Sequence, residues 1–116
     1  MGSPQVPSES LAEFELLVML AAVRLGPSEA YTVSIAKDIA DRTGRSVRRA
    51  NVYTTLQRLE GKGLVSTRLG DPRPERGGRT RRLVTVEADG LGALRATTTA
   101  IQAMVGDLTK VLGGAA

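Results

Sequence analysis

Residues 48–69, RRANVYTTLQRLEGKGLVSTRL, contain the pattern on which the expected fold depends. Val52, Leu56 and Leu59 recur at three- and four-residue spacing, which predicts the buried face of a helix that begins near residue 48. The glycines of the following GKG end this helix, because glycine adopts a positive φ without penalty. The next six residues, LVSTRL, predict a strand.

The segments on either side extend this pattern. Upstream, apolar periodicity predicts a helix from Leu11 to about Leu25, capped by Ser8 or Ser10, and a second helix from Ala30 or Tyr31 to Gly44. Downstream, a Pro-, Gly- and Arg-rich loop over residues 70–79 precedes a returning strand over residues 80–86. The order helix, helix, turn, helix, hairpin predicts a winged helix-turn-helix, a mostly α fold with a small β-hairpin (α+β).

The last segment has a different pattern. Leu91, Leu94, Thr98, Ile101 and Val105 are spaced alternately by three and four residues, and the pattern continues through Leu108 and Leu112. It predicts a long helix over residues 88–113 with more apolar edge than one compact domain can cover. We therefore expect this helix to pack against a second copy of the chain.

A length of 116 residues fits one folded domain. We divide the chain into a flexible N-terminal arm (1–9), a winged helix-turn-helix DNA-binding domain (10–87) and a C-terminal dimerisation helix (88–113). The dimer interface is expected to involve the first helix as well as the last, through Phe14, Leu17, Leu94, Ile101, Val105, Leu108 and Leu112.

The net charge of +4 conceals an uneven distribution. The stretch 42–82 contains twelve basic and three acidic residues, a local charge of +9, whereas the remainder carries −5. Eleven of the twelve basic residues are Arg, the side chain best suited to bidentate contacts with phosphate or guanine. A basic middle segment of this kind favours a surface that meets nucleic acid.

The helix over 48–62 presents an outward face of amides, hydroxyls and arginines, which are groups that can contact base edges and phosphates. Arg58 has two open interpretations: contact with phosphate, or an ion pair with Glu60 or another acid that stabilises the fold. The predicted DNA-binding residues on this helix and on the hairpin are Arg48, Arg49, Asn51, Tyr53, Thr54, Gln57, Arg58, Lys62, Arg73, Arg76, Arg79 and Arg81.

Composition argues against several other classes of protein. The chain has no His and no Cys, which excludes thiol chemistry, His-based triads and zinc sites built from these residues. The sequence around Lys62 lacks the pattern of a phosphate-binding loop. We therefore expect no enzyme activity, no metal and no cofactor. The longest strongly apolar run is eight residues and no signal peptide is visible, so we expect a cytoplasmic protein without membrane contact.

Three stretches resemble the PadR family of bacterial transcriptional regulators: EAYTVSIAKDIADRTGRSV (29–47), NVYTTLQRLEGKGLVSTRL (51–69) and RPERGGRTRRLVTVEADGLGALRA (73–96). The resemblance runs from about residue 11 to residue 96. It implies a homodimeric repressor that binds an inverted-repeat operator in double-stranded DNA, with the dimer made by the last and first helices. It further implies that Tyr53 contacts the DNA backbone and that Arg79 and Arg82 occupy basic positions of the wing.

Two hypotheses remain beside this interpretation. A small-molecule effector could occupy an apolar pocket between the helices of the dimer, although few aromatic side chains are available to stack on it. Alternatively, the chain is a protein-interaction or adaptor module that uses the winged-helix fold without specific DNA binding. Retardation of duplex DNA by the protein distinguishes this alternative from a regulator.

Overall fold

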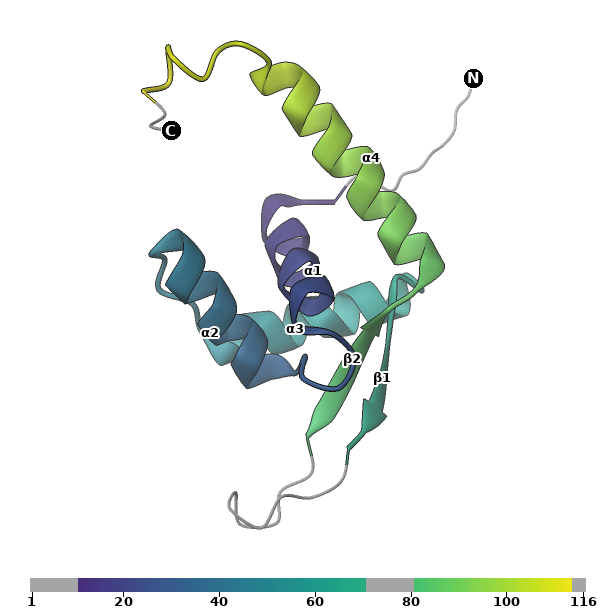
Figure 1. Cartoon of the computed structure of the whole chain (residues 1–116). Helices are drawn as coiled ribbons and strands as arrows, with labels where there is room; N and C mark the ends of the chain where they lie inside the picture. Colours follow the sequence, from purple (N-terminus) through teal and green to yellow (C-terminus); the bar gives the residue numbers. More distant parts are fainter. Residues whose placement is uncertain (1–10, 71–80, 114–116) are drawn as a thin grey trace.

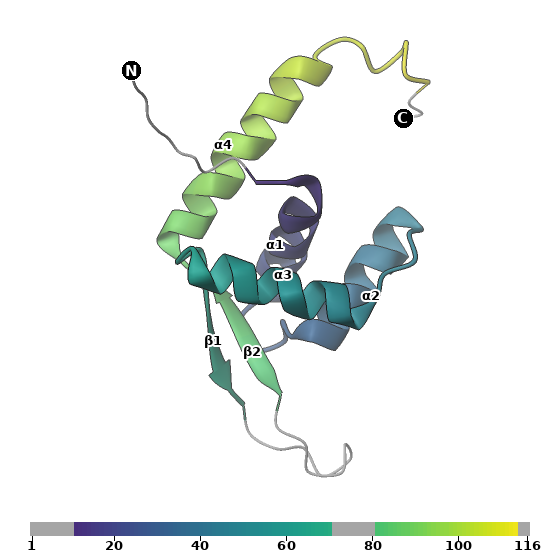
Figure 2. The same ribbon diagram turned by 180° about the vertical axis from the view of Figure 1, so that it is seen from behind.

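The computed structural model describes residues 11–70 and 81–113. The predicted arm, the serines proposed as caps and most of the hairpin loop lie outside these residues. Helix α4 extends from the end of the hairpin toward the opposite side of the domain, α1 lies in the middle, and α3 crosses the back (Figures 1 and 2). The elements in chain order are α1 (Glu13–Leu25), α2 (Thr32–Thr43), α3 (Arg49–Gly61), β1 (Val65–Leu69), β2 (Arg82–Val86) and α4 (Ala88–Val105).

Helix α1 is the central helix of the domain. Its residues Val18 and Met19 are fully buried, and it packs against α2, α3, β2 and α4. The predicted start differs, because the residue before the helix is Ala12 rather than a serine. The Ala12 N–H instead donates to the Glu15 carboxylate at 3.0 Å, which satisfies one of the free donors at the helix start.

The helix-turn-helix follows the predicted pattern closely. Helix α2 ends at Gly44, which has a φ of 75°, in the left-handed region that favours glycine. Val52, Leu56 and Leu59 form the buried face of α3 as predicted. The polypeptide leaves α3 through Gly63, whose φ is 78°.

The hairpin is a two-stranded antiparallel sheet in which Val65 pairs with Val86 and Leu69 pairs with Arg82. Leu83 and Val84 are buried against the domain. The Val84 N–H also donates to the Ala30 carbonyl at 2.9 Å, which attaches the second strand to the start of α2. These contacts fix the base of the wing beside the helix-turn-helix.

Helix α4 begins close to the hairpin and ends earlier than predicted. At Gly90 a Cβ atom would lie 2.2 Å from the Leu64 carbonyl oxygen, so only glycine allows this approach. The helix ends at Val105, since Gly106 has a φ of 47° that interrupts it. The prediction of a single helix over 88–113 was therefore wrong: Leu108 and Leu112 lie in turns after the helix.

The core cluster consists mainly of aliphatic side chains, in keeping with the low aromatic content of the chain. Its largest fully buried side chains are Met19, Ile35, Leu59, Val18, Val52 and Val84. In the described parts of the chain, none of the helices has the length and apolarity needed to cross a bilayer.

Candidate nucleic-acid interface

The outward side of α3 is open to solvent along its whole length (Figure 2). Because 3.6 residues complete one turn, residues that avoid the buried stripe of Val52, Leu56 and Leu59 gather on the other side. The exposed residues on or beside α3 that were predicted to bind DNA are Arg48, Arg49, Asn51, Tyr53, Thr54, Gln57, Arg58 and Lys62. Among the described residues, Lys62 is the only one of these whose side chain forms an ion pair or hydrogen bond with another element.

Tyr53 and Gln57 lie one turn apart on this surface and are joined by a hydrogen bond. The Gln57 amide Nε2 donates to the Tyr53 hydroxyl at 3.2 Å. About half of the Tyr53 residue surface, 49%, is exposed. The bond orients the phenol along α3 and leaves the Gln57 carbonyl available as an acceptor.

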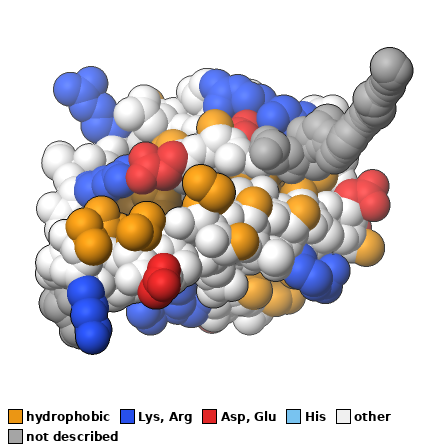
Figure 3. Space-filling model, turned by 90° about the horizontal axis from the view of Figure 1, so that it is seen from above, with side chains coloured by type: hydrophobic (Ala, Val, Ile, Leu, Met, Phe, Trp, Pro, Cys, Tyr) orange, Lys and Arg blue, Asp and Glu red, His pale blue; other side chains and the backbone are white. Residues whose placement is uncertain are grey.

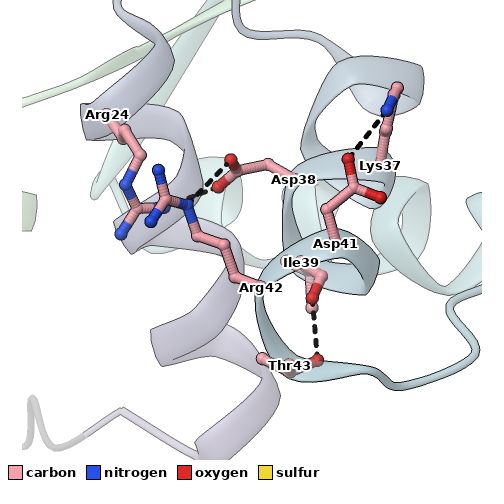
Figure 4. A network of polar contacts seen from close by, with 7 residues as sticks. All are labelled: Arg24, Lys37, Asp38, Ile39, Asp41, Arg42 and Thr43. Carbon is pink, nitrogen blue, oxygen red and sulfur yellow. Dashed lines mark hydrogen bonds and ion pairs between the residues drawn. The ribbon is translucent and has the colours of Figure 1, made fainter.

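The basic residues of α1 and α2 all form ion pairs within the domain (Figure 4). Asp38 pairs with Arg24 at 2.5 Å and with Arg42 at 3.1 Å. Lys37 pairs with Asp41 at 2.7 Å, and this hydrogen bond and charge raise the Lys37 pKa above its ordinary value. The two carboxylates thus offset two of these three positive charges, since Asp38 is shared by Arg24 and Arg42.

The basic residues of α3 and the hairpin behave differently. Among the described residues, no acid lies within ion-pair distance of Arg48, Arg49, Arg58, Arg68 or Arg82. Arg58 forms no ion pair with Glu60, but its charge lies near enough to the buried Glu15 carboxylate to help lower the pKa of that group, so both interpretations of Arg58 stay open. Positive charges without an acidic partner therefore lie on α3 and on the strands of the wing, where an anion can approach them.

The strands of the wing are linked to the end of α3. Arg82 donates to the Thr67 hydroxyl at 3.1 Å, and that hydroxyl donates to the Glu60 carboxylate at 3.1 Å. Arg68 donates to the Pro27 carbonyl at 3.3 Å and was not predicted as a site residue. Its place among the twelve basic residues of the stretch 42–82 is the sequence signal that could have found it. The predicted contacts Arg73, Arg76 and Arg79 lie outside the described residues.

Two predicted DNA-binding side chains have partners inside the domain. The Lys62 ammonium donates to the buried Glu15 carboxylate at 3.0 Å. The Arg81 side chain is only 9% exposed and lies over the Tyr31 ring, 4.8 Å from its centroid. Its guanidinium is 3.9 Å from Glu29. Neither contact could be predicted from the sequence, because each joins residues that are far apart in the chain.

The residues predicted for a dimer interface are divided between the core and the surface. Leu94 is buried in its own domain, while Phe14 and Leu17 are half-buried. Ile101 is 45% exposed and Leu112 is 68% exposed. An open apolar hollow is lined by Ala100, Ile101, Met104, Val105, Leu108 and Leu112. The view from above shows hydrophobic side chains around a hollow at this end of the molecule (Figure 3).

A helix-turn-helix followed by a hairpin, with uncompensated arginines on the third helix and the strands, defines a winged-helix protein of the nucleic-acid-binding type. The model of the transcriptional regulator PadR-like family matches residues 19–96. The chain therefore belongs to the PadR-like family and is a DNA-binding regulator of transcription, not an enzyme.

Solved structures agree with this family. A PadR family transcriptional regulator from Eggerthella lenta DSM 2243 is 25% identical, with a TM-score of 0.65 and 86% of each chain covered. A PadR-like transcriptional regulator from Bacillus cereus strain ATCC 14579 is 16% identical, with a TM-score of 0.66 and coverage of 86% of this chain and 94% of that one.

A third structure is that of Bordetella bronchiseptica BpsR, whose DNA binding is described as regulated by 6-hydroxynicotinic acid. It is 20% identical, with a TM-score of 0.59, 89% of this chain and 71% of that one covered. A search of curated proteins finds no match to this chain.

Proposed function

We propose that this chain is a homodimeric repressor that binds an inverted repeat in double-stranded DNA. The observation that carries the proposal is the contrast in charge pairing among the described residues: Arg24, Lys37 and Arg42 form ion pairs with acids, whereas Arg48 and Arg49 at the start of α3 do not. Arg95 and Lys110 also lack an ion pair in this part of the chain, but they lie singly on and after α4, whereas five such arginines lie on or beside α3 and on the strands of the hairpin. Phosphates supply the missing negative charge.

Each group on α3 has a role that suits its chemistry. Asn51, Thr54 and Gln57 share the exposed side and carry amides and a hydroxyl, which read base edges in the major groove. Arg48 and Arg49 lie at the start of α3, where the helix dipole adds to their attraction for phosphate.

The remaining proposed contacts lie beside Asn51, Thr54 and Gln57. Tyr53 contacts the DNA backbone next to the bases that these three residues read. Arg58, Arg68 and Arg82 extend the contact toward the wing, whose loop residues Arg73, Arg76 and Arg79 reach flanking DNA.

The dimer is proposed to form through α4 and α1. Gly90, Leu94 and Thr97 form the side of α4 that is buried in its own domain, and at 100° per residue the same side continues through Ile101 and Met104. These last two are exposed, Met104 by 79%. The apolar side of α4 therefore continues beyond the part that its own domain covers. Burial of this exposed part against a partner is more favourable than its exposure to solvent. We include in this proposal a small-molecule effector bound in the apolar hollow at the interface, and a cytoplasmic location.

Selection from a randomised duplex pool, followed by footprinting, tests the proposal. We expect a palindromic site whose half-sites lie about one helical turn apart. Arg49→Ala should reduce the slope of log K against log salt by about 0.9. Arg95→Ala is the matched control, because Arg95 is exposed on α4 away from α3. Equal binding to selected and scrambled duplexes would refute specific regulation, and no retardation of any duplex would favour the adaptor module.

A further inference from the structure

The first turn of α1 contacts the polypeptide at both ends of α3. Its two acids, Glu13 and Glu15, are two residues apart and therefore lie about 200° apart around the helix. They reach in different directions: Glu13 to Arg45 in the segment before α3, and Glu15 to Lys62 directly after it. One turn of the central helix thus holds the entry and the exit of the recognition helix.

The two contacts differ in geometry and in burial. Arg45 forms a forked contact with Glu13, with nitrogen–oxygen distances of 2.6 and 3.3 Å. Both side chains are largely exposed, so water screens this pair. Lys62 is half-exposed, but the Glu15 side chain that it meets is only 5% exposed. A buried carboxylate depends on its partner far more than an exposed one does.

The surroundings of Glu15 keep it ionised. Burial by itself would raise the pKa of the Glu15 carboxyl, but the Ala12 N–H, the Lys62 ammonium and the nearby Arg58 charge leave that pKa below its ordinary value. Glu15 Oε1 accepts from Ala12, and Glu15 Oε2 accepts from Lys62. Each oxygen therefore has its own donor, and the carboxylate joins the start of α1 to the end of α3.

The same turn is also attached to α4. Leu11 is buried, and its N–H donates to the Thr97 hydroxyl of α4 at 3.2 Å. The next residue, Ala12, donates its N–H to Glu15 Oε1 at 3.0 Å. The path from α4 to the end of α3 therefore consists of one buried and two partly buried hydrogen bonds around the start of α1.

We infer that Glu13 and Glu15 are positioning residues that hold both ends of α3 against α1 and so set the angle at which α3 meets its target. In this arrangement Lys62 acts through Glu15 rather than on DNA. The inference rests on the proposed function, since it assigns to these residues the orientation of the helix that reads the operator. A partly buried ion pair of this kind contributes little net stability compared with apolar residues, so the role we assign to it is to fix the relative orientation of α1 and α3.

The central test compares Glu15→Gln, Lys62→Gln and Lys62→Arg on a duplex selected by the wild-type protein and on a scrambled duplex. Glu15→Gln and Lys62→Gln should each lower affinity for the selected duplex by about fivefold or more. Affinity for the scrambled duplex and the salt slope should stay at the wild-type values. Lys62→Arg keeps a cation at this position and should restore selectivity.

Matched controls separate positioning from stability. Asp41→Asn breaks an ion pair that lies wholly within α2, and it should leave selectivity unchanged. Glu13→Gln should have a smaller effect than Glu15→Gln, because the pair it breaks is exposed. Circular dichroism during thermal unfolding identifies any variant that is not folded at the assay temperature. If either Lys62→Gln or Glu15→Gln is unfolded, the other variant is used for the test, because each of them breaks the same ion pair.

Two results would overturn the inference. The first is a salt slope that falls by about 0.9 in Lys62→Gln while Glu15→Gln binds like the wild type, since Lys62 would then contact phosphate. The second is an unchanged orientation of α3 relative to α1 in free Glu15→Gln, measured from amide residual dipolar couplings. That measurement needs no DNA, so it decides the inference even where the wild-type protein selects no duplex and the proposed function itself fails.

Discussion

The contact of α4 with the base of the wing allows a quantitative test, the substitution Gly90→Ala. A Cβ at Gly90 would lie 2.2 Å from the Leu64 carbonyl oxygen, 2.8 Å from Met19 Cε and 2.9 Å from Val86 Cγ1. Met19 can move its flexible end, but the Leu64 oxygen belongs to the backbone. That oxygen also accepts from the Glu87 N–H at 2.9 Å, so moving α4 away weakens a hydrogen bond at the entry to the helix.

The size of the effect follows from three contributions. Overpacking a close contact costs about 1–3 kcal/mol. Weakening the hydrogen bond to Leu64 costs about 1 kcal/mol more. The gain in helix propensity from Gly to Ala offsets about 0.5–1 kcal/mol. We therefore expect Gly90→Ala to lower the free energy of unfolding by about 1–3.5 kcal/mol, or Tm by roughly 5–20 °C for a domain of this size.

Gly92 provides the matched control for this substitution. It lies in the same helix, but a Cβ there would meet no heavy atom within 4 Å. Gly92→Ala should therefore raise the free energy of unfolding by about 0.5–1 kcal/mol. Urea unfolding at one fixed protein concentration measures both variants, because the proposed dimer would make apparent stability depend on concentration. Equal stability of the two variants would refute the close approach of α4 to β1.

Three further predictions concern the core, the end of α4 and acid stability. Met19→Ala should lower the free energy of unfolding by about 2–5 kcal/mol because Met19 is fully buried, and urea unfolding that shows a loss below 1 kcal/mol would contradict this packing. Gly106→Ala should extend α4, since alanine rarely adopts the φ of 47° found there, and far-ultraviolet circular dichroism should show more helix than in the wild type. The Glu15 pKa is lowered in the folded state, so its stabilisation is present above pH 4.5 and is lost as the pH falls through the folded value. The difference in unfolding free energy between wild type and Glu15→Gln should shrink from about pH 6 to about pH 3, and a constant difference would argue against an ionised Glu15.

The helix-turn-helix was predictable because its signals are local. The buried positions of α3 follow from a period of three and four residues, and the glycines that end α2 and α3 follow from the φ values that helix ends require. The exposed polar row of α3 follows from the same periodicity. The contacts of these residues with DNA stay predictions, since they depend on a partner.

The end of α4 shows where local reasoning failed. The spacing of Leu91, Ile101, Leu108 and Leu112 fits one continuous helix, but Gly106 adopts a conformation that interrupts it. The heptad pattern also assigned Leu94 to a partner, whereas the fold buries it against its own domain. Apolar periodicity predicts which side of a helix is buried. It does not predict whether that side is buried against the same domain or against a partner.

The sequence alone therefore determined the order of elements, the positive segment and the side of α3 that is free to bind. Each of these depends on neighbours within one or two helical turns. Only the tertiary structure decided which charges remain unpaired: Lys62 meets Glu15, and Arg81 packs over Tyr31, although both appear in the sequence as members of one basic segment. The reason is physical, because a charge can be neutralised by any acid within about 4 Å in space, at whatever distance along the chain.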